Sequence, residues 1–103
     1  MTDHENNALD ALEKHRKAID RLDAIWLYAL AERFAHTNDV GKLKAKYKLE
    51  SYDPKRERAQ KERLRQMAIN AGLDPDFAEK MLDVISHDVI KHHNEIKENT
   101  KEQ

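Results

Sequence analysis

The chain has 103 residues, no cysteine, 19 Lys and Arg against 20 Asp and Glu, and a net charge of -1. This length fits a single domain, residues 1–103, and the lack of cysteine excludes a disulfide framework and fits a cytoplasmic protein. The balanced charge argues against nucleic-acid binding, and no apolar run is long enough to span a membrane.

Few helix-breaking residues and a charged fraction of 38% indicate an all-α fold of long amphipathic helices. Both prolines follow an aspartate, at Asp53-Pro54 and Asp74-Pro75, and an aspartate cap before proline marks a helix start. Gly72 is suited to end the helix that precedes the second start. The pattern therefore predicts three helices and an ordered core over about residues 8–97. The helices are expected at about residues 9–47, 54–71 and 75–97.

The first predicted helix has about forty residues and a length near 60 Å. A compact domain of this size is narrower than that, so the helix needs a surface beyond its own chain to cover its apolar side. A second copy of the chain is the simplest such surface. We therefore expect a two-fold homodimer in which the long helices pack against each other.

Three cations interrupt the apolar stripe of this helix, namely Arg16, Arg33 and Lys44. One such residue usually reaches solvent at the edge of a stripe, but three favour an anionic ligand because a buried cation needs a counter-charge. Arg33 and Lys44 share a face about 16 Å apart along the axis, so both can contact a metabolite. Arg16 lies about 25 Å from Arg33 and points about 100° away, so it could serve only the site of a dimer partner.

The second predicted helix begins with a polar inward face where a core face would be apolar. An exposed first turn explains this face equally well, and capping alone explains Asp53. Next to Arg33 and Lys44, the same face also describes the wall of a wet pocket. Its residues are Asp53, Arg56 and Glu57.

The third predicted helix has a core stripe that includes Val89 and one polar member, His93. Such a histidine near a helix end is usually hydrogen-bonded or solvated. The six histidines lack metal-ligand spacing, and the chain has neither a nucleophile–base pattern nor a Gly-rich phosphate loop. The residues by themselves therefore predict a helical dimer with a pocket for a small polyanion and no metal or covalent catalyst.

Five segments together resemble the all-helical chorismate mutases of the dimeric AroQ class, from about residue 9 to about residue 93. They are RKAIDRLD (16–23), LAERF (30–34), VGKLK (40–44), YDPKRE (52–57) and AGLDPDF (71–77). The resemblance implies three helices with a very long first helix, in an intertwined homodimer. It also implies the Claisen rearrangement of chorismate to prephenate in phenylalanine and tyrosine biosynthesis, a reaction that needs no cofactor.

The resemblance further implies roles for single residues. Arg33 would bind one substrate carboxylate, and Arg16 from the partner chain would bind the other. Lys44 would contact a carboxylate and the ether oxygen, where charge develops in the reaction. The wall near the substrate hydroxyl would be formed by Asp53, Glu57 and the supporting Arg56.

Two positions depart from the family pattern. His93 stands where the family usually has a glutamine, or a protonated glutamate, that donates to the ether oxygen. We expect His93 to take this role, and activity to fall as pH rises if only the imidazolium is competent. Val89 stands where the family often has a serine that touches a carboxylate, so only its backbone or its packing would contribute.

Other functions stay open at this stage. An isochorismate pyruvate-lyase of the same fold would use a similar pocket, although YDPKRE fits the mutases better. A helical dimer that is weakly active or non-catalytic until a partner enzyme of the pathway binds is also consistent with His93. The lysines at positions 42–48 alone suggest nucleic acid or membrane, and such a run is usually a solvated face.

Overall fold

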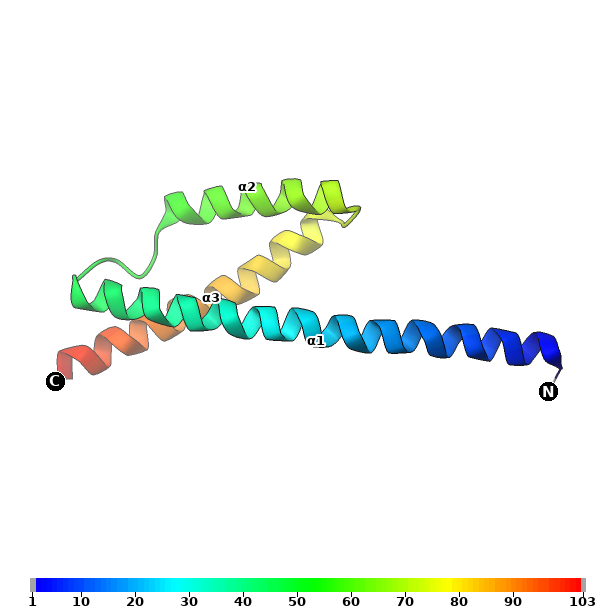
Figure 1. Ribbon diagram of the computed structural model, residues 1–103. Coiled ribbons are helices and arrows are strands. Elements are labelled where there is room, and N and C mark those ends of the chain that lie inside the picture. Colours follow the sequence, from blue (N-terminus) through cyan, green and yellow to red (C-terminus); the bar gives the residue numbers. More distant parts are fainter. Residues whose placement is uncertain (1, 103) are drawn as a thin grey trace. The chain divides into compact units, whose positions relative to one another are not determined.

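The computed structural model describes residues 2–102, which form three α-helices and no strand (Figure 1). This confirms the all-α prediction of three helices with a very long first one. The second helix has the predicted bounds. The helices are α1 (Asp3–Lys46), α2 (Pro54–Ala71) and α3 (Pro75–Glu102). No helix in this described range combines the length and the apolar run that crossing a membrane requires.

The first helix begins earlier, and the third helix ends later, than the predicted residues 9 and 97. The first helix begins at Asp3 because the Glu5 N–H donates to the Thr2 hydroxyl at 3.1 Å, and acidic side chains in the first turn favour the helix dipole. The third helix continues to Glu102 because neither glycine nor proline follows Lys97.

Local signals set both ends of α2. The Asp53 carboxylate accepts from the Arg56 N–H at 3.1 Å, and Pro54 occupies the first helical position. At the other end Gly72 has φ 78°, and the next N–H, that of Leu73, donates to the Ala68 carbonyl at 2.8 Å. This is a Schellman ending, in which glycine adopts the left-handed conformation without strain.

The same ending closes α1, with a lysine in the glycine position. Lys48 has φ 57°, and the Leu49 N–H donates to the Lys44 carbonyl at 2.7 Å. A side chain is unfavourable in this conformation, so Lys48 places a small strain on the turn that follows α1.

Residues up to 35 and residues from 36 onward form two compact units, and each is described by itself. The first unit is a stretch of helix whose large apolar side chains are exposed, including Trp26 at 53% and Tyr28 at 79%. A lone helix has no core of its own, so this apolar surface is available to a partner.

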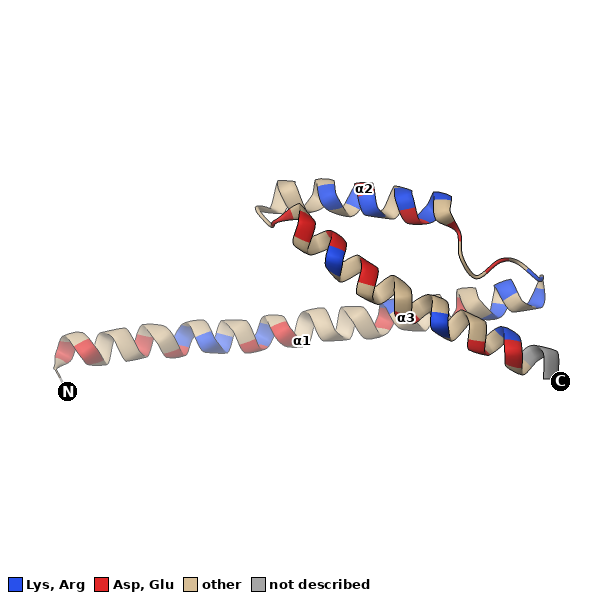
Figure 2. Cartoon of the chain, turned by 180° about the vertical axis from the view of Figure 1, so that it is seen from behind, with Lys and Arg blue, Asp and Glu red and all other residues tan. Residues whose placement is uncertain are grey.

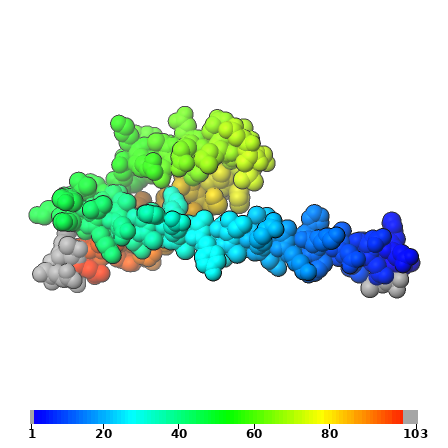
Figure 3. Space-filling model, in the orientation of Figure 1, coloured from blue at the N-terminus to red at the C-terminus, as the bar shows by residue number. Residues whose placement is uncertain are grey.

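In the second unit, α2 packs against α3, and Figure 3 shows the lime end of α2 beside the yellow start of α3. The small residues Ala68 and Ala78 are buried near the turn, and Leu82 is 1% exposed. Figure 2 shows Lys and Arg along α2 and Asp and Glu near the start of α3. Arg65 binds Asp76 at 2.9 Å, and Lys61 lies 3.8 Å from the Asp83 carboxylate. Such exposed ion pairs contribute little stability, so the apolar contacts hold the two helices together.

Candidate functional site

Lys44 is tied to the loop that leads into α2. Its ammonium donates to the Ser51 carbonyl at 3.1 Å, and Ser51 is 7% exposed. The Ser51 hydroxyl is also buried and has no hydrogen-bond partner among the described residues. Because Ser51 precedes Asp53 by two residues, the ammonium lies near the N-terminus of α2, as the sequence had suggested.

The first turn of α2 presents the three polar side chains expected there. Asp53 caps the helix, Arg56 is exposed, and Glu57 is half-buried. A hydrogen bond to the Glu57 carboxylate, with burial and the carboxylate charge, raises the pKa of the Tyr52 hydroxyl above its usual value. Tyr52 was not among the predicted site residues.

His93 lies against the backbone of α1. Its ring is 3% exposed, and Nε2 is 2.7 Å from the Thr37 carbonyl oxygen. The other ring nitrogen, Nδ1, is buried and finds no partner among the residues described. Val89 is half-buried one turn earlier on the same face of α3.

Gly41 allows this approach of His93. A Cβ at position 41 would lie 2.5 Å from the His93 ring carbon Cδ2 and 3.0 Å from the end of Ile96. The sequence analysis missed Gly41 and Thr37. The available signal was a glycine inside a long helix, which often marks a close approach of another group.

The second unit thus gathers its site residues on one face of α1. Thr37, Gly41 and Lys44 follow the i, i+4, i+7 spacing that places side chains on one helix face. His93 contacts Thr37 and Gly41, and the Lys44 ammonium hydrogen-bonds the loop that precedes α2. Arg16 is exposed and Arg33 is half-buried in the first unit, so their approach to this face stays a prediction.

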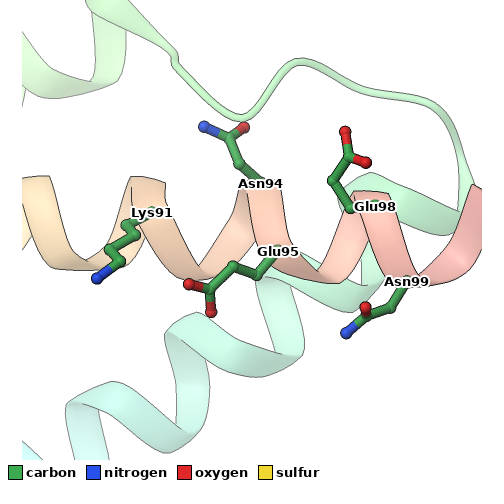
Figure 4. Close-up of a pocket in the computed structure, with 5 residues that line it drawn as sticks. All are labelled: Lys91, Asn94, Glu95, Glu98 and Asn99. Atoms are coloured by element: carbon green, nitrogen blue, oxygen red, sulfur yellow. The ribbon is translucent and has the colours of Figure 1, made fainter.

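Two surface hollows of the second unit contain none of the predicted site residues. In the first, on α3, Asn94 and Glu98 point to one side, while Lys91, Glu95 and Asn99 point to the other (Figure 4). The side chains diverge and include two carboxylates, so this hollow does not suit a dianion. The second lies on α2 and mixes cations with Glu62 and Ile69. Among the side chains that the structure describes, those of residues 2–99, no three metal-ligating groups gather at one point.

Comparison with known proteins identifies the family. Residues 15–94 match the family model described as chorismate mutase type II. The match covers most of the chain and every predicted site residue from Arg16 to His93. No curated protein matches the sequence significantly. The family expected from the five sequence segments is thereby confirmed, and with it an enzyme of the isomerase class. The chain belongs to the chorismate mutase type II family.

Proposed function

We propose that the protein catalyses the Claisen rearrangement of chorismate to prephenate, in the biosynthesis of phenylalanine and tyrosine. Family membership supports mutase activity in general. The observation that carries the finer proposal is that Lys44 lies on the same face of α1 as Thr37 and Gly41, the two residues that His93 contacts. A lysine and a histidine on one face could both act on an ether oxygen that gains negative charge.

The proposed chemistry needs no nucleophile, redox partner or proton transfer. Within one molecule the ether C–O bond breaks while a C–C bond forms, so atoms and electrons balance without a co-reactant. The site holds the compact, chair-like conformer and stabilises the charge that develops on the oxygen. This requirement matches a site of charged and polar groups without a covalent catalyst.

Lys44 is proposed to bind a substrate carboxylate and the ether oxygen. In the free chain its ammonium bonds to a neutral carbonyl, that of Ser51. Chorismate would offer it an anionic acceptor, which attracts the ammonium more strongly than a neutral carbonyl does. Arg33 is proposed to bind one carboxylate, and Arg16 from the partner chain the other.

The start of α2 is proposed to face the substrate hydroxyl, through Asp53 and Glu57 with Arg56 in support. Glu57 is half-buried and is hydrogen-bonded by Tyr52, which supports a fixed carboxylate at this wall. His93 is proposed as the second donor to the ether oxygen. Val89, one turn away, would contribute packing or its backbone.

An intertwined homodimer is part of the proposal. Its support is the apolar surface of the first unit, where leucine, isoleucine, tryptophan and tyrosine side chains are about half exposed or more. Apolar patches of this extent mark protein interfaces, and an isolated helix gains little stability alone. We propose that each chain acts as a single mutase domain, and the cysteine-free composition supports a cytoplasmic location.

The test is to incubate the purified protein with chorismate and, separately, with isochorismate, and to identify the products by chromatography. Prephenate from chorismate is expected, with loss of activity in Lys44→Met and little change in Lys42→Met, an exposed lysine on the same helix. Salicylate and pyruvate from isochorismate, without prephenate, would assign a lyase instead. No product from either substrate would indicate a binding protein or the need for a partner enzyme.

A further inference from the structure

Gly41 is an unusual residue for its place in α1. Glycine is less favourable than alanine inside a helix, so its presence there calls for a compensating contact. The contact is the ring of His93, which occupies the space that a side chain at position 41 would need. The two residues are far apart in sequence, and Thr37 lies one turn before Gly41 on the same face of α1.

The Thr37 carbonyl determines which ring nitrogen carries the proton. A carbonyl oxygen only accepts hydrogen bonds, so Nε2 of His93, 2.7 Å away, must donate to it. The neutral ring is therefore the Nε2–H tautomer, in which Nδ1 carries no proton. Nδ1 is buried and lacks a hydrogen-bond partner in the described part of the chain. A buried polar atom of this kind is costly unless it gains a partner.

We propose that Gly41 is a positioning residue for His93. Because Gly41 has no side chain, the His93 ring can approach α1 until Nε2 hydrogen-bonds the Thr37 carbonyl. Nδ1 is then the ring nitrogen that faces the substrate. Nδ1 accepts a hydrogen bond from the ligand in the neutral ring and donates one in the imidazolium. This inference rests on the proposed mutase site, because the substrate supplies the partner that Nδ1 lacks.

A stability cycle tests the contact without any assay of activity. The full chain is compared as wild type, Gly41→Ala, His93→Ala and the double variant, by thermal unfolding. Gly41→Ala should lower the Tm when His93 is present, because the added methyl group displaces the ring. In the His93→Ala background the same change should cost much less or raise the Tm, because only the flexible end of Ile96 then opposes the gain in helix propensity. An increase in both backgrounds would overturn the contact and the proposal with it.

Histidine NMR and kinetics test the positioning role. Long-range proton–nitrogen spectra of ¹⁵N-labelled protein should show His93 as the Nε2–H tautomer, with the signal identified by its loss in His93→Gln and its persistence in His92→Gln. Gly41→Ala should remove this tautomer preference and lower kcat about 100-fold, with a smaller change in KM. In the His93→Gln background the same change should cost far less activity.

The outcomes separate the inference from the proposed function. A fixed tautomer together with an unchanged kcat in Gly41→Ala would mean that the contact is structural only, and would overturn the positioning role. A His93 ring protonated on Nδ1 alone would overturn the tautomer assignment. Wild-type protein that is inactive on chorismate would remove the mutase and the positioning role together, while the stability cycle and the NMR spectra would still report the contact.

Discussion

Replacing Lys44 with methionine removes the ammonium and keeps most of the apolar stem. Two effects of different size should follow. The Ser51 carbonyl loses its donor in a partly buried place, which costs about 1 kcal/mol of unfolding free energy, the low end of the range for a buried group that loses its partner. The site loses a cation at the developing charge, and such a loss lowers kcat about 10²–10³-fold, or by roughly 3–4 kcal/mol in the transition state.

Urea unfolding and steady-state conversion of chorismate measure these two effects separately. Lys42→Met is the matched control, because Lys42 is exposed on the same helix. Lys44→Arg keeps a charge with different geometry and should recover stability more fully than kcat. If Lys44→Met loses about 1 kcal/mol of stability but keeps its kcat and KM, the lysine only anchors the loop and its proposed catalytic role is wrong.

Three further predictions concern the helix end, the dimer and the second donor. Lys48→Gly should raise the unfolding free energy by about 0.5–1 kcal/mol, because glycine relieves the left-handed strain at φ 57°; an unchanged value in chemical unfolding would contradict this. Trp26→Glu should dissociate the dimer and abolish activity, because the substitution places a charge on the proposed interface. Sedimentation measures the mass of the variant, and a variant that stays an active dimer would refute the prediction. If only the imidazolium form of His93 is competent, the kcat of wild type should fall as pH rises, whereas His93→Gln should give a flat profile; equal pH profiles would exclude an imidazolium donor.

The ends of a helix were predictable from the sequence where capping residues close to the end determine them. Asp53, Pro54 and Gly72 place both ends of α2, because caps depend on side chains within a few residues of the helix end. The early start of α1 also had a local signal, since Thr2 and Glu5 have the spacing of a capping box. It was missed because the apolar stripe, which begins at Leu9, was taken as the start of the helix.

By itself, the sequence determined the family and the three helices, and it predicted the polar residues of the candidate site, because motif spacing and helix periodicity are properties of neighbouring residues. Only the tertiary structure showed what these residues touch. Thr37 and Ser51 act through backbone carbonyls, which every residue carries and which leave no mark in a sequence. Gly41 and His93 meet only because α1 and α3 pack there, and that contact decides which nitrogen of the ring is left for a ligand.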